Sequence, residues 1–365
     1  VADDALEAVL VLVPGGHEAG EGRAQAEVDL LPRHHGVDHR LVHRSQGPQR
    51  ARDLARQGDE RRSDAIAALG EALEKDDDAS VRSACALSLA DMCADEAVAA
   101  LLKATRDREA SVRQMALTAL GEIGDESSLQ AIEVALKDRA PAVRFQAVIA
   151  LPRVCTDHRR ATKALLKATR DDDAVVVHIA LRMAEELGGG DDEDDAVDDR
   201  MVARATKLLD HDDDSVKVAA AIIVARSGKS GGDDVIAGVV NGSIKTREIE
   251  DEAAAVELAG ELRVKAAHAG LERRAFGGLF GMGGNRLAWQ ARVSLAALGH
   301  PRASRWIMKE LAGWTKERRT LAVAAAMRAR LTDAVSLIAA MEGDPARAEP
   351  EAVRQALEVL RDGQD

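Results

Sequence analysis

A repeat with a period of 31 residues constrains the fold of this chain more than any other feature of its sequence. A Val-Arg pair begins at Val81, at Val112 and at Val143, each time shortly after an aspartate and at the start of a similar apolar pattern. Looser copies follow at 172–188 and 212–228. A fixed period of about 20–50 residues is the signature of a solenoid. We therefore expect an array of stacked units over most of the chain.

Within one unit the apolar residues recur with the period of an α-helix. In the second copy they define one helical face, at Val112, Met115, Ala116, Ala119, Leu120 and Ile123. A second helical segment precedes each of these helices, for example 96–107. One such hairpin cannot bury its own apolar face, so neighbouring hairpins must stack. The pattern weakens after residue 230 but continues to 361, and it predicts about eight or nine hairpins.

The order of a helix, an aspartate, a short turn and a Val-Arg pair that opens a second helix resembles the HEAT-like repeat. The similarity is greatest to the short bacterial kind, which also occurs in bilin lyases. The resemblance implies an all-α fold, a curved right-handed α-solenoid. It also implies that the repeated aspartate and arginine form a hydrogen-bonded ladder between neighbouring units. That ladder falls here on Asp76, Arg82, Asp107, Arg113, Asp138 and Arg144.

Composition divides the chain into three segments. Residues 1–61 hold five of the ten histidines, no lysine and no hydrophobic period, so we expect a disordered leader or a start assigned too far upstream. Residues 62–260 are predicted to form acidic repeats one to six. Residues 261–365 are predicted to form repeats seven to nine, with a glycine-rich loop at 276–284 and a polar helix as the C-terminal cap.

Charge and cysteine content limit the location and the partners. The formal net charge is −13, which argues against nucleic-acid binding along the whole chain. No apolar run approaches the length of a membrane span, and three cysteines are too few for a disulfide framework. We therefore expect a cytoplasmic protein.

No residues stand out as a catalytic, cofactor or metal site. The glycine-rich loop lacks the lysine of a phosphate-binding P-loop and the spacing of a dinucleotide-binding loop. The only Cys-x-x-His, at 155–158, has no second pair for zinc. Acidic stretches at 188–199 and 210–214 fit solvated loops, with a loose cation site or a docking surface for a basic partner as alternatives.

The C-terminal third differs from the rest in both charge and aromatic content. Residues 261–330 contain fourteen Arg or Lys and four Asp or Glu, a local charge of +10, and five of the six aromatic residues lie between 276 and 314. Arginine and tryptophan are enriched at binding hot spots. We predict contacts with a partner at Arg273, Arg274, Phe276, Phe280, Trp306, Arg318 and Arg319.

The predicted function is a non-enzymatic protein-binding or scaffold module whose partner has an acidic surface. Two other functions stay open: nucleic-acid binding through residues 261–330, and a lyase-type enzyme or lyase chaperone related to bilin lyases, as the resemblance implies. Head-to-tail self-association between the acidic and basic segments is a further alternative. The glycine-rich loop either packs between units or exposes its apolar residues to the partner.

Overall fold

The computed structural model describes residues 59–92, 94–188, 198–277 and 285–362. Phe280, most of the predicted glycine-rich loop, most of the predicted leader and residues 189–197 of the acidic stretch lie outside this range. The described residues form eighteen α-helices, which follow one another as nine helical hairpins, and no strand. The all-α fold of stacked hairpins predicted from the repeat is therefore confirmed.

Each hairpin consists of an odd-numbered and an even-numbered helix. The first five are α3 (Asp59–Lys75) with α4 (Ala79–Asp91), α5 (Val98–Ala104) with α6 (Ala110–Ile123), α7 (Leu129–Ala135) with α8 (Pro141–Val154), α9 (His158–Ala168) with α10 (Ala174–Leu187), and α11 (Asp199–Leu208) with α12 (Asp214–Arg226). The other four are α13 (Asp233–Asn241) with α14 (Ile249–Glu261), α15 (His268–Phe276) with α16 (Ala288–Ala297), α17 (Pro301–Leu311) with α18 (Lys316–Arg328), and α19 (Val335–Ala339) with α20 (Pro350–Asp362).

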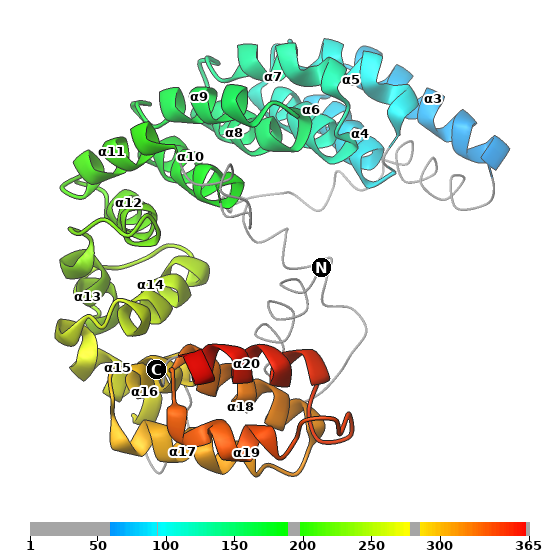
Figure 1. Cartoon of the computed structure of the whole chain (residues 1–365). Coiled ribbons are helices and arrows are strands. Elements are labelled where there is room, and N and C mark those ends of the chain that lie inside the picture. The colour runs from blue at the N-terminus through cyan, green and yellow to red at the C-terminus, as the bar shows by residue number, and fades with distance from the viewer. Residues whose placement is uncertain (1–58, 93, 189–197, 278–284, 363–365) are drawn as a thin grey trace. The chain divides into compact units, whose positions relative to one another are not determined.

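The helices belong to two compact units, and the chain passes from the N-terminal to the C-terminal unit within α12, between Ala219 and Ala220. In the N-terminal unit α4, α6, α8 and α10 contact one another in turn and form one layer, and the odd-numbered helices form the other (Figure 1). In the C-terminal unit α14, α16, α18 and α20 likewise contact in sequence. The division predicted at residue 260 rests on charge and aromatic content and stays a prediction.

Small residues allow neighbouring helices of one layer to pack closely. In α6 the side chains of Val112, Ala116 and Leu120 are fully buried, as the helical period predicts. A Cβ atom added at Gly121 would lie 3.1 Å from the Cα atom of Ala150 in α8. Interiors of this density leave no room for larger side chains, so the alanine-rich, aromatic-poor composition of these helices follows from their spacing.

Arginine and aspartate side chains connect successive hairpins of the N-terminal unit. Arg82 donates from Nε and Nη2 to the carboxylate of Asp107 in the next hairpin, at 2.8 and 2.9 Å. Its Nη1 donates to the main-chain carbonyl of Asp76 in its own hairpin, at 2.8 Å. The carboxylate that Arg82 binds is therefore not that of Asp76 but that of the aspartate one repeat further along the chain.

The same arrangement recurs twice. Arg113 binds the carboxylate of Asp138, and Arg144 binds that of Asp171, through paired hydrogen bonds of 2.6–2.7 Å. Each aspartate also accepts the backbone N–H two residues on, which fixes the turn before the next helix. Such two-pronged arginine–carboxylate pairs are among the stronger hydrogen bonds in proteins. Val177 occupies the arginine position of the fourth copy, so the series ends there.

We predict that acid destabilises the N-terminal unit through these aspartates. Burial acts to raise the pKa of Asp107, Asp138 and Asp171, but hydrogen bonds from the arginines and from backbone N–H groups outweigh it and lower each pKa. An unfolded aspartate has a pKa of about 3.9. The stabilisation is therefore fully present above that pH and is lost as the pH falls through the lower, folded-state pKa.

The measurement is the thermal midpoint of unfolding, followed by circular dichroism between about pH 7 and pH 2. The wild type should lose stability steeply at the acid end. An Asp107→Asn variant should start lower at neutral pH and show a shallower fall, because one titrating carboxyl has been removed. Equal slopes for the two proteins would contradict the prediction.

Candidate partner-binding surface

The helices α15, α17 and α18 of the C-terminal unit carry all the predicted contact residues that the structure describes. Arg274, on α15, is mostly buried and forms an ion pair with Glu252. Its guanidinium also donates to the carbonyls of Val239 and Val240, both at 3.0 Å. These carbonyls belong to the last turn of α13, and that of Val239 also accepts the backbone N–H of Gly242. Arg274 therefore caps a neighbouring helix.

The neighbouring arginine contacts the end of the same helix more loosely. Arg273 is exposed and donates from Nη2 to the carbonyl of Asn241 at 3.1 Å. This acceptor is a main-chain oxygen at the surface, and the Arg273 side chain is exposed, so most of the guanidinium remains open to solvent. Of the two arginines, Arg273 is the one that has donors left for a partner.

The two predicted arginines on α18 differ in the same way. Arg319 donates to the carbonyls of Gly313, Ala346 and Arg347 at 2.5–3.0 Å, and thus connects its own hairpin to the next. Arg318 pairs with the buried carboxylate of Glu310 at 3.0 Å, yet 60% of its side chain is exposed. Arg319 therefore holds two stacked hairpins together, whereas Arg318 lies at the surface.

Phe276 and Trp306 are brought together by a third residue, Arg292 on α16. The Arg292 guanidinium lies 5.6 Å from the centroid of the Phe276 ring and 4.7 Å from that of Trp306. Trp289, also on α16, packs edge-on against Trp306 with the ring centroids 4.6 Å apart. A cation held over aromatic faces is attracted by the ring quadrupole. We call Phe276, Trp289, Arg292 and Trp306 the aromatic–arginine cluster.

Charge in the cluster is balanced by one buried carboxylate. Burial lowers the pKa of Arg292, Glu310 counteracts this, and the nearby charge of Arg302 lowers the pKa further. Arginine stays protonated in proteins despite such shifts. Glu310 is 8% exposed and faces both Arg318 and Arg292. The cluster is thus a fixed, charged platform between α15, α16 and α17.

An exposed row of cations crosses α17 beside the cluster. Arg302, Arg305 and Lys309 are spaced by three and four residues, which places them on one helical face, and all three are exposed. The Arg302 guanidinium lies 4.0 Å from the centroid of the Phe276 ring, so the row begins at the aromatic–arginine cluster. We call these three residues the α17 stripe.

Trp314 extends this surface beyond the end of α17. It lies in the turn between α17 and α18 and is 97% exposed, the largest exposed fraction among the large hydrophobic residues of the described chain. Tryptophan is one of the residues that are enriched at binding hot spots. Our sequence reasoning counted Trp314 among the aromatics but did not select it. The helical spacing of the three stripe cations was the signal that would have located this surface.

The comparisons with known proteins agree with the observed fold. Residues 98–185 match the family model described as HEAT repeats, and residues 81–107 match the model described as PBS lyase HEAT-like repeat. No curated protein sequence matches the chain. Along the described chain, no helix is long and apolar enough to cross a membrane.

Three solved structures are similar at low sequence identity. An engineered protein is 18% identical with a TM-score of 0.45, covering 89% of this chain and 97% of its own. The complex of CpcE and CpcF of phycocyanin lyase from Nostoc sp. PCC7120 is 17% identical with a TM-score of 0.37, covering 65% and 97%. Escherichia coli YibA is 12% identical with a TM-score of 0.41, covering 90% and 99%. The assignment of the fold is therefore based on the helices themselves and on the repeat matches. The chain contains HEAT repeats, matched at residues 98–185, within the nine hairpins of its described part.

Proposed function

We propose that this protein is a non-enzymatic binding or scaffold module, and that its C-terminal unit holds another protein with an acidic surface. The observation that supports this most directly is the α17 stripe with Trp314 at its end. Arginine and lysine are suited to carboxylates, and an exposed indole supplies a large apolar area that becomes buried on docking. Arg273 and Arg318 are exposed and offer further donors, and the Phe276 ring holds the guanidinium of Arg302.

The fold is compatible with this use but does not specify it, because helical arrays serve many functions. A repeat array offers an extended surface built on a rigid stack, which suits a partner that spans several helices. The location that accompanies the proposal is the cytoplasm, as the low cysteine content suggests.

The test is capture of partners from a lysate of the source cells, with and without nuclease treatment. The variant changes Arg305→Glu, Lys309→Glu and Trp314→Ala, all exposed positions outside the core. We expect it to lose capture of the main partner by about thirtyfold or more, because tryptophan hot spots alone contribute about 2 kcal/mol or more.

A matched control makes the same kind of changes in the N-terminal unit. Arg106→Glu, Lys163→Glu and Val134→Ala alter two exposed cations and an exposed apolar side chain there. The control should capture as the wild type does. If both triple variants capture equally well, the α17 stripe is not the docking surface.

Two other functions give distinct results in the same experiment. Capture that disappears with nuclease indicates nucleic-acid binding through residues 261–330. Visible absorbance from a bound chromophore in the purified protein indicates a lyase-related function, the other function that the resemblance implies. Light scattering that reports assemblies at low salt and monomers at high salt indicates head-to-tail self-association.

A further inference from the structure

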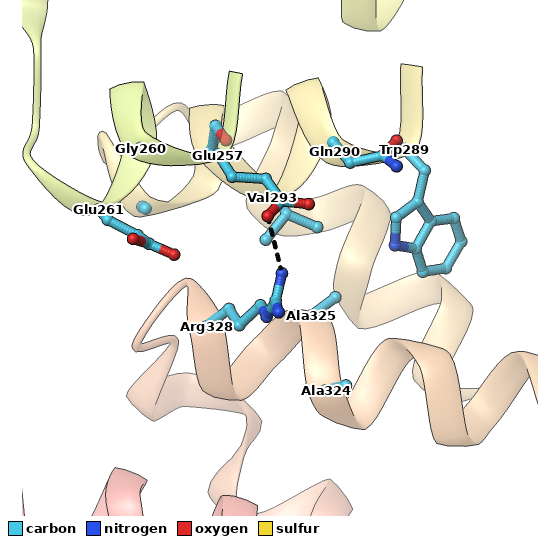
Figure 2. Close-up of a pocket in the computed structure, with 11 residues that line it drawn as sticks. Glu257, Gly260, Glu261, Trp289, Gln290, Val293, Ala324, Ala325 and Arg328 are labelled. Atoms are coloured by element: carbon cyan, nitrogen blue, oxygen red, sulfur yellow. Dashed lines mark ion pairs between the residues drawn. The ribbon is translucent and has the colours of Figure 1, made fainter. Parts of the chain in front are cut away.

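A pocket opens between α14, α16 and α18 of the C-terminal unit, on different helices from the α17 stripe. Figure 2 shows Glu257 and Arg328 facing each other across it, with Glu261 on one side and Gln290 and Trp289 on the other. The empty space among the lining side chains, including its open mouth, is about 430 Å³. Because this figure includes open solvent, the pocket is an open groove rather than an enclosed cavity.

The walls of the pocket are apolar and its floor is formed by close helix packing. Val293, Ala324 and Ala325 supply aliphatic surface from α16 and α18. Gly260 brings α14 against Ser294 of α16, so the two helices leave no gap beneath the pocket. Such walls suit the methylene stem of a long side chain, which gains free energy when it leaves water.

One polar atom in the pocket lacks a partner. The side-chain oxygen Oε1 of Gln290 is buried and accepts no hydrogen bond from any described residue. Buried acceptors of this kind are rare because leaving them unsatisfied costs free energy. A ligand that brings an N–H donor to this oxygen removes the free-energy cost of the unsatisfied acceptor. The pocket therefore favours a ligand with an N–H donor.

The charges at the pocket favour a cation. Glu257 and Arg328 form a pair at 3.4 Å and offset each other. Glu261 adds a second carboxylate, which is exposed. The lining therefore carries two carboxylates and one guanidinium, a net charge of −1, and the charge of Arg226 acts on Glu257 from outside the lining. The surrounding segment 261–330 is strongly basic, so this is a local reversal of charge.

We propose that this pocket binds the guanidinium of an arginine side chain presented by a partner protein. The stem lies against Val293 and the alanines of α18, and the head donates to Gln290 Oε1 and to the carboxylates of Glu257 and Glu261. Guanidinium has five N–H donors in a planar fork and can serve an amide oxygen and a carboxylate together, whereas ammonium is a compact point charge. The site goes beyond the proposed function, since it lies on other helices and selects the opposite charge.

Acid should weaken this binding. Burial raises the pKa of Glu257, the charge of Glu261 raises it further, and Arg328 and Arg226 lower it, with a raised value as the net result. Glu257 therefore becomes neutral at a higher pH than an ordinary glutamate, while arginine keeps its charge. The affinity for arginine should fall as the pH drops through that raised pKa.

The test uses the full chain and three short capped peptides that are identical except for one residue, which is arginine, citrulline or lysine. Citrulline has nearly the shape of arginine but no charge. The chain has three tryptophans, so three indole N–H signals report binding by nuclear magnetic resonance, and a Trp289→Phe variant assigns the relevant one. We expect the arginine peptide to shift the Trp289 signal, the lysine peptide to bind more weakly, and citrulline to bind at least about tenfold more weakly.

Five variants locate the site. Gln290→Leu should weaken arginine binding about tenfold and Glu261→Gln should weaken it severalfold, while Glu358→Gln, an exposed carboxylate on α20, should change nothing. Arg328→Met at about pH 8 should strengthen binding, because it removes the competing cation. The Trp314→Ala variant should bind the arginine peptide as the wild type does, which separates this site from the α17 stripe.

Three results would overturn the proposal. Arginine and citrulline peptides that bind equally would show that charge plays no part. Weaker binding in Arg328→Met would mean that the pocket prefers an anion. Shifts confined to the Trp314 signal would place the arginine on another surface.

Discussion

Replacing Arg113 with methionine should destabilise the N-terminal unit by about 3–5 kcal/mol, the cost of breaking a buried ion pair from one side. The Arg113 side chain is 6% exposed and that of Asp138 is 15% exposed. Without Arg113, the carboxylate of Asp138 loses two hydrogen bonds and its counter-charge. The carbonyl of Asp107 loses its donor as well. An uncompensated charge would then lie between two hairpins.

The midpoint of thermal unfolding, measured by circular dichroism, tests this. Arg106→Met, an exposed arginine of the same hairpin, should stay within about 0.5 kcal/mol of the wild type. Arg113→Lys should fall in between, because lysine keeps the charge but not the paired hydrogen bonds. Adding Asp138→Asn to Arg113→Met should recover part of the loss by removing the orphaned charge. Similar midpoints for Arg113→Met and Arg106→Met would show that the pair does not hold the hairpins together.

Replacing Gly260 with alanine should destabilise the C-terminal unit by about 1–3 kcal/mol, the usual cost of overpacking. A Cβ atom at this position would lie 2.6 Å from the Cα atom of Ser294. That neighbour is main chain, which cannot rotate away, so α14 and α16 must separate. Ser294 also donates from Oγ to the carbonyl of Val256 at 2.7 Å, and separation would stretch this bond.

A second glycine provides a control of opposite sign. A Cβ atom at Gly70 in α3 would meet only the Cβ atom of Ala100, at the ordinary distance of 3.8 Å. Gly70→Ala should therefore stabilise the protein by about 0.5–1 kcal/mol through helix propensity. Unfolding curves in urea give both values. A neutral or stabilising Gly260→Ala would refute the close approach of α14 and α16.

The close contact between α14 and α16 also connects the stability of the C-terminal unit with ligand binding. Gly260 and Ser294 both line the pocket proposed to take an arginine. Gly260→Ala should therefore weaken binding of the arginine peptide as well as lower the midpoint of unfolding. The α17 stripe lies on another helix, so capture of the acidic partner should persist in this variant at temperatures where the unit is folded.

The sequence by itself determined the hairpins, because helix faces follow from the local spacing of apolar residues. The period of 31 residues located α4, α6 and α8, and the equivalent positions of Arg82, Arg113 and Arg144 singled them out as a set. The partner of each arginine is determined by how the hairpins stack and not by the spacing of residues in the sequence. Asp171, which completes the series, lies 27 residues after Arg144, and the sequence analysis did not include it.

Only the tertiary structure decided which arginines of the basic segment are available to a partner. Sequence reasoning grouped Arg274 with Arg273 and Arg319 with Arg318, since adjacent arginines look alike in a sequence. In the folded chain Arg274 and Arg319 bind main-chain carbonyls of neighbouring hairpins, whereas Arg318 remains largely exposed. Carbonyls in turns and at helix ends can accept further hydrogen bonds, and the packing of the next helix determines which side chain reaches them.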